Sequence, residues 1–149
     1  MLHDITYITT LGEMRLTQAQ NFITSFYFTT QDWSPNQLNN APHSYIYYKL
    51  LRSDVKKLKL KPAGTEFQKK VWQAVQTIKF GETATYQAIA NKIGQPNAVR
   101  AVANAVGNNP IALLIPCHRI VRTDGALGGY KWGIERKKWL LKYEASSVY

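Results

Sequence analysis

The first thirty residues alternate between apolar and polar side chains over short stretches rich in β-branched and aromatic residues. A period of two predicts β-strands, and a glycine at position 12 predicts a turn between the first two of them. The expected strands cover residues 5–9, 14–16 and 22–30. A polar loop over 32–43 and a helix over 45–54, capped by Ser44, are expected to follow. This half of the chain is therefore expected to form a small, strand-rich α/β domain.

The apolar spacing changes to that of helices after a basic connector over residues 55–64, which could end in a strand. Thr65 and Gln68 form a capping box, in which each side chain satisfies a backbone donor of the other residue. The apolar residues of one helix face follow: Phe67, Val71, Trp72, Val75 and Ile78. This helix is expected to be structural and to stop at Phe80-Gly81. The connector gives the best domain boundary, between residues 1–60 and 61–149.

Two short helices separated by a tight turn are expected next. The first covers residues 84–92 and ends at Gly94, and the second covers 98–106 and ends at Gly107. Asn97 is the expected cap of the second helix. Helix, glycine, short turn and helix in this order outline a helix-turn-helix within a mainly helical C-terminal domain.

The second of these helices has two different faces. One face carries Val99, Val102 and Val106, which should meet the core. The other carries Ala101, Asn104 and Ala105 around Arg100. Side chains this small let a helix backbone approach another surface closely, although an alanine-rich helix packed inside the protein would show the same pattern.

Residues 109–121 hold the only cysteine of the chain and one of its three histidines. The apolar run 111–115 is short and branched, so it is expected to be a buried strand or extended core segment closed by Pro116. Such a segment would hold Cys117 rigidly. A thiol attacks as the thiolate, and the neighbouring imidazole of His118 can take its proton. Cys117 could instead be a small core hydrophobe.

The last part of the chain combines flexible turns with a helix. Residues 122–125 predict a turn, and Gly128-Gly129-Tyr130 provides a second flexible backbone stretch. A final helix is expected over 134–144, with Trp139, Leu140 and Leu141 facing the core. Glu144 lies near its C-terminus, where the helix dipole disfavours a carboxylate. It is either a surface residue on a frayed end or a carboxylate held there to orient His118.

Composition excludes several classes of protein. A hydrophobic fraction of 45%, with many aromatic residues, is enough for an ordinary core and argues against disorder. No apolar stretch approaches the ~20 residues of a membrane span, and the first residues resemble no secretory signal. A single cysteine cannot form an internal disulfide, which fits a reducing cytoplasm. Neither Cys117 nor the histidines His3, His43 and His118 show metal-ligand spacing, so no metal site is expected.

The net charge of +10 is unevenly distributed. Residues 1–60 carry a balance of +2, whereas residues 61–149 carry +8. A positive surplus concentrated in the C-terminal part suggests a polyanionic partner for that part. Charge alone fits RNA, DNA or an acidic membrane equally well.

The segment Pro116-Cys117-His118-Arg119, with Asn109-Pro110 seven residues before Pro116-Cys117, resembles the acceptor motif of the O(6)-alkylguanine-DNA alkyltransferases. These DNA-repair proteins move an alkyl group from damaged guanine onto their own cysteine. The family pattern continues in order and spacing over residues 58–145, in Gly64-Thr65-x-Phe67-Gln68, Val71-Trp72, Gly81-x-x-x-x-Tyr86, Ala98-Val99-Arg100-Ala101-Val102, Gly128-Gly129-Tyr130 and Leu140-Leu141-x-x-Glu144. The resemblance implies a winged-helix-like helix-turn-helix in residues 61–149. Residues 1–60 resemble the family less closely, and there it implies a truncated ribonuclease-H-like domain.

The resemblance also implies roles for individual residues. Cys117 would be the nucleophile and alkyl acceptor, and His118 would take the thiol proton through a water. Glu144 would orient the imidazole, as in a hydrolase-like relay. Asn109 would brace the same turn, and Tyr86 would rotate the damaged nucleotide and donate a hydrogen bond to the leaving guanine. Pro116 and Arg119 would be structural.

Two further groups of residues are implied to contact the DNA and the damaged base. Arg100 would enter the duplex where the base has left, and the remaining DNA-binding residues would be Ala101, Asn104, Ala105, Thr85 and Gln87. The base pocket would be formed by Tyr86, Ile120, Gly128, Gly129, Tyr130 and Lys131.

The implied reaction is direct, irreversible transfer from O(6)-alkylguanine, and from O(4)-alkylthymine, in duplex DNA. The target atom is buried in the base stack, so the nucleotide must be flipped out at a cost of a few kcal/mol. Each molecule would react once, without a cofactor. The protein is expected to be a monomer in a prokaryotic-type cytoplasm, associated with the nucleoid through DNA, and cooperative binding of copies along DNA is left open.

Three departures from the family pattern matter. The zinc-binding cysteines of some N-terminal domains are absent, which again predicts no metal. Cys117 is present, whereas the related alkyltransferase-like proteins replace it. Lys131 and Trp132 occupy positions at which members vary, so the range of alkyl groups stays open.

Three other functions fit parts of the sequence. A helix-turn-helix regulator would use Cys117 only as core or as a redox sensor. A cysteine hydrolase would use Cys117 and His118, but adjacent side chains usually diverge and no oxyanion-hole motif is evident. A lesion sensor would bind damaged duplex and leave the thiol unmodified.

Overall fold

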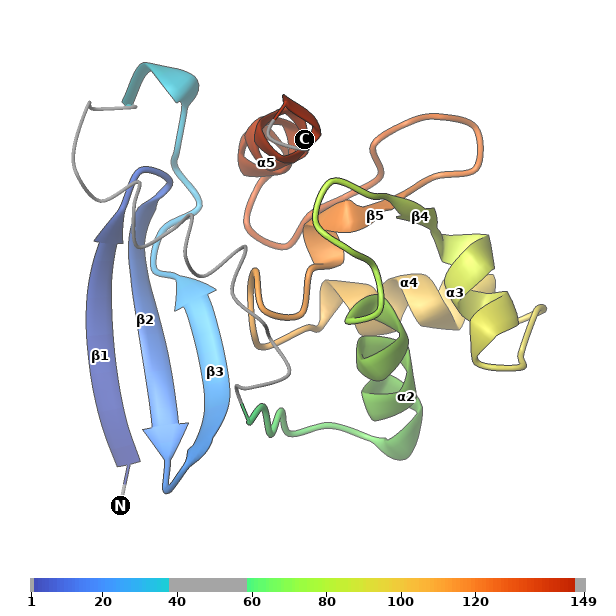
Figure 1. Ribbon diagram of the computed structural model, residues 1–149, viewed down its shortest axis with the longest axis horizontal. Helices are drawn as coiled ribbons and strands as arrows, with labels where there is room; N and C mark the ends of the chain where they lie inside the picture. Colours follow the sequence, from blue (N-terminus) through green and yellow to red (C-terminus); the bar gives the residue numbers. More distant parts are fainter. Residues whose placement is uncertain (1, 38–58, 147–149) are drawn as a thin grey trace.

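The computed structural model describes residues 2–37 and 59–146. An antiparallel sheet lies beside a helical part, and the apolar segment before Cys117 runs between them (Figure 1). The expected helix over 45–54, and residues 38–43 of the expected loop, lie outside the described residues. The coarse prediction of a strand-rich N-terminal part and a helical C-terminal part is confirmed for the described residues.

The sheet has the order β1-β2-β3, with β1 at Leu2–Thr9, β2 at Gly12–Ala19 and β3 at Phe22–Phe28. All three predicted strands are present. The first two are longer than expected because their hairpin pairs every residue from Leu2↔Ala19 to Thr9↔Gly12 and so carries polar residues into the ladder. Gly12 has φ 111°, a conformation that favours glycine at this turn.

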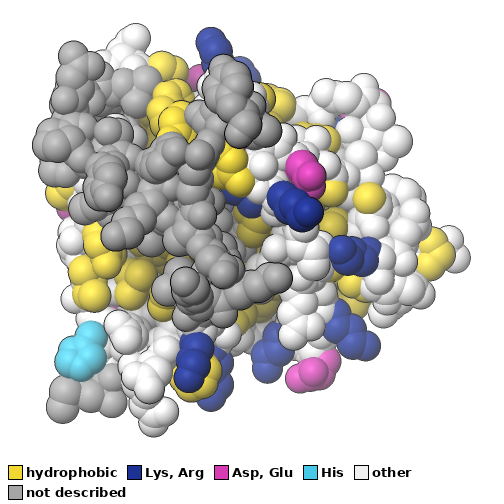
Figure 2. Space-filling model, viewed as in Figure 1, with side chains coloured by type: hydrophobic (Ala, Val, Ile, Leu, Met, Phe, Trp, Pro, Cys, Tyr) yellow, Lys and Arg dark blue, Asp and Glu magenta, His cyan; other side chains and the backbone are white. Residues whose placement is uncertain are grey.

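The helical part contains four α-helices among the described residues: α2 (Glu66–Val75), α3 (Tyr86–Lys92), α4 (Val99–Gly107) and α5 (Ile134–Ser146). The capping box of Thr65 and Gln68 is present as predicted. The helix α2 ends before Ile78, earlier than expected. Its last turn tightens, because Thr77 Oγ1 donates to the Ala74 carbonyl at 2.6 Å and the Thr77 and Ile78 amides bond only three residues back. Lys and Arg side chains gather over the region of α2 on the face seen in Figure 2.

The pair α3 and α4 differs from the expected helices at its N-termini. Residues 84–85 are not helical; they form β4 (Ala84–Thr85), which pairs with β5 (Ile120–Val121), and Thr85 caps α3. Asn97 is not the cap of α4: the cap position is Ala98, without a side-chain cap bond. The turn is closed from α3 instead, since Gln87 Nε2 donates to the Pro96 carbonyl at 2.9 Å.

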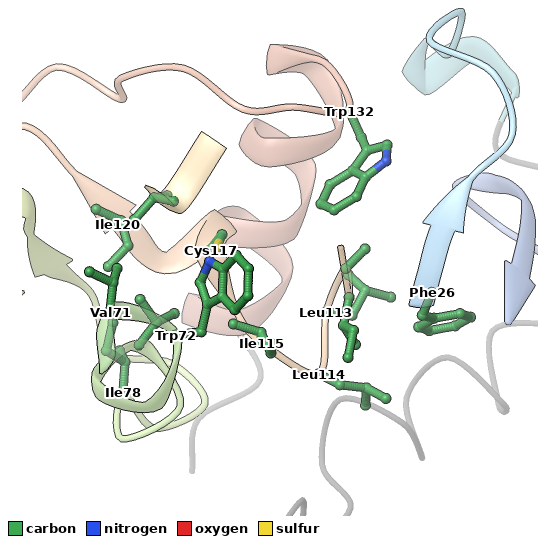
Figure 3. Packing of buried hydrophobic residues seen from close by; sticks show 14 of the residues in the cluster. Phe26, Val71, Trp72, Ile78, Leu113, Leu114, Ile115, Cys117, Ile120 and Trp132 are labelled. Carbon is green, nitrogen blue, oxygen red and sulfur yellow. The ribbon is translucent and has the colours of Figure 1, made fainter. Parts of the chain in front are cut away.

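The run 111–115 is buried as predicted, but the expectation of a strand or extended segment is wrong. Only Ile111 forms a β-bridge, to Phe26, and the following residues make a tight turn with Leu113 at φ 69°. A short 3-10 helix, η3 (Cys117–Arg119), comes directly after it. The apolar side chains point into the shared core, between Phe26 of β3 and residues of α2 such as Trp72 (Figure 3).

Within the described residues, no helix is long and apolar enough to cross a membrane. The same part of the chain contains no cluster of three or more His, Cys, Asp or Glu side chains that could hold a metal ion.

Candidate active site

Asn109 shapes the turn that leads to Cys117. Its side chain is fully buried, and Oδ1 accepts a hydrogen bond from the Ile111 amide at 2.9 Å. Nδ2 donates to the carbonyls of Ile111 at 3.1 Å and Ile115 at 2.9 Å. The Asn109 side chain therefore satisfies backbone groups that a strand would have paired with a neighbouring strand, which explains why the run folds as a turn. Cys117 follows this braced turn at the start of η3, with 4% of its surface exposed.

Glu144 of α5 accepts two short hydrogen bonds from residues of η3. His118 Nε2 lies 2.6 Å from Oε2, and Arg119 Nε donates to Oε1 at 2.6 Å. Arg119 Nη1 also donates to the Ile78 carbonyl at 2.9 Å, which ties η3 to the end of α2. Glu144 is 1% exposed, so the interpretation as a surface residue on a frayed end is wrong.

The protonation states of this cluster follow from burial and partners. Burial opposes the charged form of Glu144, yet the hydrogen bonds and charges of His118 and Arg119 outweigh it and lower the pKa of the carboxyl. Burial lowers the pKa of His118 despite the nearby carboxylate. The imidazole is therefore neutral at pH 7, with its proton on Nε2 facing Glu144. Nδ1 is then a buried acceptor that no described protein group satisfies.

The Cys117 thiol is protonated at rest. Burial raises its pKa to about 12, against the opposing effects of the Asn109 side chain and the Lys137 and Lys131 ammonium groups. A resting thiolate would be the usual form of a reactive cysteine. Here the site instead holds a neutral thiol beside a neutral imidazole, so deprotonation must accompany the reaction.

Lys137 is a site residue that the sequence analysis missed. Its side chain is fully buried on α5, and Nζ donates to the carbonyls of Ile120 at 2.6 Å and Gly129 at 3.0 Å. Burial lowers the pKa of Lys137 to about 8, although Cys117 raises it. Lys137, Leu140 and Glu144 are spaced by three and four positions and share the buried face of α5. That spacing could have revealed Lys137, since a lysine on an apolar helix face needs partners.

A pocket of about 230 Å³ opens over Cys117. Its lining consists of Tyr86, Ala103, Val106, Gly107, Cys117, Gly129, Tyr130, Lys131 and Trp132. Four of the expected base-pocket residues, Tyr86, Gly129, Tyr130 and Lys131, are in this lining. The α4 residues of the lining were not assigned to the pocket, since Val106 was expected to face the core and Gly107 to end the helix. Trp132 was noted only as a variable position next to the expected pocket residues.

Ile120 and Gly128, the other two expected pocket residues, do not line this pocket. Ile120 is fully buried beneath the site, where its carbonyl accepts from Lys137. Gly128 lies behind Tyr86: a Cβ added there would come within 2.9 Å of the Tyr86 hydroxyl, and its φ of 74° also favours glycine. Gly128 therefore makes room for Tyr86.

The two tyrosines at the pocket keep their protons. Burial, with a contribution from Cys117, raises the pKa of Tyr86 and of Tyr130. Tyr130 packs edge-on against His118 and against Trp132, at ring distances of 6.4 Å and 5.4 Å. Protonated hydroxyls can act as hydrogen-bond donors to a bound base.

The expected DNA-binding residues divide into two groups. Arg100, Ala101 and Asn104 are exposed on α4, as expected. Ala105 is not part of an exposed face: it is 2% exposed and its carbonyl accepts from Trp72 Nε1 at 2.8 Å. Ala105 lies three residues after Val102 on the helix, which places it at the border of the buried stripe.

Thr85 and Gln87, the remaining expected DNA contacts, have local structural partners. Thr85 Oγ1 accepts from the Ala88 amide at 3.0 Å, and Gln87 Nε2 donates to Asn91 Oδ1 at 3.0 Å as well as to Pro96. Both residues are only half-buried. Their side chains stabilise the helix pair whether or not they also contact DNA.

Residues 66–146 match the DNA-binding domain of 6-O-methylguanine DNA methyltransferase. The chain belongs to this family. A methylated-DNA--protein-cysteine methyltransferase of Mycobacterium tuberculosis is 37% identical over 158 aligned positions, which cover 98% of this chain and 94% of that relative. A probable enzyme of the same name from Acanthamoeba polyphaga mimivirus is 52% identical over 74% of this chain and 73% of its own.

Another relative in the family is much longer than this chain. The bifunctional transcriptional activator/DNA repair enzyme Ada of Escherichia coli is 46% identical over 73% of this chain, and the match covers 33% of Ada. The chain thus corresponds to about a third of that relative.

Solved structures in the family have the same fold. The crystal structure of Mycobacterium tuberculosis O6-methylguanine methyltransferase superimposes with a TM-score of 0.80 at 35% identity, over 100% of this chain and 96% of that one. The complex of Mycobacterium tuberculosis OGT with DNA gives a TM-score of 0.79, over 97% of this chain and 93% of that one. Schizosaccharomyces pombe Atl1, bound to damaged DNA, gives 0.50 at 30% identity over 58% of this chain and 82% of that one.

Proposed function

We propose that this protein repairs O(6)-alkylguanine in duplex DNA by transferring the alkyl group to its own Cys117. The observation that carries the proposal is the position of Cys117, which lies in the pocket lining. The next residue, His118, is bonded in the buried interior to Glu144 of α5. Family membership and the relatives named methylated-DNA--protein-cysteine methyltransferase support the same reaction.

In the proposed reaction, sulfur forms a bond to the alkyl carbon while the bond from that carbon to guanine O6 breaks. The proton of the Cys117 thiol passes through a water to His118 Nδ1, which is the acceptor that the tautomer leaves open. The Glu144 carboxylate, 2.6 Å from Nε2, stabilises the imidazolium that results. The product is a thioether, which none of the side chains in the pocket can reverse, so each molecule reacts once.

The departing guanine needs a hydrogen-bond donor as charge develops on it. Tyr86 lines the pocket and keeps its hydroxyl proton, because burial raises its pKa. Gly128 lies directly against that hydroxyl, and its lack of a Cβ leaves room for the Tyr86 ring. A donor fixed in advance stabilises developing charge without reorganising during the reaction.

The pair α3 and α4 serves, in this proposal, as a winged-helix-like helix-turn-helix that approaches the DNA. Arg100 and Ala101 are exposed on α4, while Ala103 and Gly107 of the same helix line the pocket. One helix can therefore contact the duplex and face the flipped base. Arg100 would fill the space that the base leaves and offset part of the flipping cost of a few kcal/mol. The +8 balance of residues 61–149 favours a phosphate backbone as partner.

The proposal also covers the oligomeric state, the location, the cofactors and the domains of the protein. The chain is proposed to act as a monomer in the cytoplasm, without metal or cofactor, on O(4)-alkylthymine as well as O(6)-alkylguanine. The proposal also divides the chain into two domains. Residues 1–60 form a truncated ribonuclease-H-like domain, and residues 61–149 form the alkyltransferase domain.

A lesion sensor without transfer activity is the second candidate function. The likeness to Atl1, whose solved structure holds damaged DNA, favours it. The protonated resting state of the Cys117 thiol would also suit a protein that binds lesions without reacting.

Intact-protein mass spectrometry after incubation with duplex DNA that carries one O(6)-methylguanine distinguishes the two functions. We expect one added methyl group per molecule, mapped to Cys117 and absent from Cys117→Ser. Tight binding of the damaged duplex with an unmodified thiol would show a sensor. No preference for the damaged duplex and no modification would refute both.

A further inference from the structure

Two backbone segments that line or adjoin the pocket are hydrogen-bonded to the N-terminal part of the chain, either to the sheet itself or to the residues that follow it. The first is the turn before Cys117. The Phe26 amide of β3 donates to the Pro110 carbonyl at 2.9 Å, and the Ala112 amide donates to the Phe26 carbonyl at 2.6 Å. The sheet thus contacts the turn that positions the nucleophile.

The second segment is the pocket wall at Lys131-Trp132. Gln31, three residues after the end of β3, donates through Nε2 to the Lys131 carbonyl at 2.9 Å. Arg136 of α5 donates through Nη1 to the next carbonyl, that of Trp132, at 3.0 Å. Consecutive carbonyls of the wall are therefore held by two different side chains.

Arg136 is itself anchored in the N-terminal part. Nε donates to the Leu11 carbonyl at 2.8 Å, and Nη1 donates to the Thr30 carbonyl at 2.6 Å. One guanidinium therefore joins the β1–β2 turn, the end of β3 and the pocket wall. A planar, forked donor group can span three carbonyls in this way, whereas a lysine ammonium on a flexible stem cannot match the geometry.

The β1–β2 turn is shaped to receive this guanidinium. Arg136 is 1% exposed, and its Cζ lies 4.3 Å from the ring centroid of Phe28. A Cβ added to Gly12 would approach Arg136 Nη2 to 2.9 Å. Phe28 also packs edge-on against Trp132, with 6.2 Å between the ring centroids. The ring that Arg136 contacts is therefore itself in contact with the pocket wall.

We propose that Arg136 and Gln31 are positioning residues for alkyl transfer, through which the N-terminal sheet sets the distance between the pocket wall and Cys117. The inference rests on the proposed function. Bond formation at a bound carbon is sensitive to placement, and an error of about 1 Å can cost ~100-fold in rate. The N-terminal sheet therefore contributes to the reaction rate although none of its residues lines the pocket.

Single-turnover kinetics separate this role from a merely structural one. Protein in saturating excess over a duplex with labelled O(6)-methylguanine gives a rate constant for transfer, and a titration with limiting protein gives the fraction of active molecules. Gln31→Ala is the principal variant, because Gln31 is exposed and its loss leaves the core intact. Arg136→Lys tests the anchor, and Gln73→Ala is the matched control, an exposed glutamine of α2 outside the pocket lining.

We expect Gln31→Ala to lower the transfer rate constant about fivefold, the worth of one hydrogen bond, with unchanged melting temperature and DNA affinity. Arg136→Lys should lower it further, and Gln73→Ala should leave it unchanged. A wild-type rate constant in Gln31→Ala would overturn the inference, as would a loss in Arg136→Lys confined to melting temperature and active fraction. If the wild-type protein takes up no label, the proposed function itself has failed, and that result cannot be confused with equal rates in wild type and variants.

Discussion

Two regions of the molecule have roles in the proposed repair reaction and are built in opposite ways. The buried cluster, which consists of His118, Arg119, Lys137 and Glu144, keeps its charges out of water and pairs them with one another or with backbone carbonyls. The α4 face, which consists of Arg100, Ala101 and Asn104, is exposed and made mostly of small side chains. Within residues 2–37 and 59–146, no hydrogen bond or ion pair engages the Arg100 guanidinium, which leaves it available to a partner.

The difference shows how one small fold can place the groups for the proposed transfer in its interior and the groups for the proposed DNA binding on its surface. In a low-dielectric site, fixed partners control the protonation states of the side chains, and each charge interacts more strongly with its neighbours than it would in water. On an exposed face, charges and small side chains contribute through contact with a partner and little to folding. Substitutions in the two regions should therefore change different measured quantities.

The largest effect is expected for Glu144→Gln. An amide cannot stabilise the His118 imidazolium, and it leaves Arg119 without its carboxylate. Loss of one preorganised electrostatic partner costs about 10²- to 10³-fold in rate, so the single-turnover rate constant should fall by that order. Affinity for damaged duplex, measured by fluorescence anisotropy, should stay at the wild-type value. An equal loss of DNA affinity would show that Glu144 is structural only.

For Arg100→Ala, the expected loss is confined to transfer from duplex DNA. Transfer from duplex DNA should slow by about 10- to 100-fold, because nothing then offsets the cost of the flipped base. Transfer from the free base O(6)-methylguanine should be unchanged, since no flipping is needed. Comparing the two substrates in one experiment provides the control, and an equal loss with both would place Arg100 in the chemistry instead.

Ala105 and Ala101 form a matched pair on the same helix that tests where the boundary between the regions lies. Ala105→Leu should lower the free energy of unfolding by about 1–3 kcal/mol, because the added side chain enters a packed core. Ala101→Leu should leave stability nearly unchanged and weaken DNA binding, because it blocks close approach of α4. Urea denaturation and binding titrations measure both quantities. Equal stability of the two variants would be inconsistent with the buried position of Ala105.

The smallest predicted effect is a pH dependence of stability that comes from Cys117. Its pKa is raised from 9.0 to about 12 by burial, so the unfolded chain loses this proton at lower pH than the folded protein does. The stabilising contribution is complete below pH 9.0 and is lost as the pH rises toward about 12. The stability advantage of wild type over Cys117→Ser should therefore shrink across that interval in chemical denaturation. A constant difference would mean that the thiol titrates normally.

The sequence predicted elements where a local pattern and the tertiary structure agree. The capping box at Thr65 and the alternating strands of the N-terminal part are of this kind. The turn at 111–115 could not be predicted from its apolar residues, because the side chain of Asn109 supplies the backbone hydrogen bonds that a strand would have required. The family likeness assigned Asn109 to brace this turn without revealing that the brace replaces a strand.

The site was foreseen unevenly for a similar reason. Cys117, His118 and Glu144 belong to motifs, and the structure brings His118 and Glu144 into contact and sets Cys117 in the pocket. Lys137, Arg136 and Gln31 act through backbone carbonyls of distant segments, and such partners leave no motif in the sequence. Ala105 was expected to be exposed because it lies at the border of the buried stripe of α4. The contact of Trp72 with Ala105 widens this stripe, and the spacing along the helix does not reveal that contact.

The most direct test of this division is to measure, for Glu144→Gln and Arg100→Ala side by side, the single-turnover rate constant and the affinity for damaged duplex. The account predicts that Glu144→Gln keeps its affinity and loses transfer from both duplex and free base, while Arg100→Ala loses transfer from duplex alone. Parallel losses of rate and affinity in both variants would contradict it.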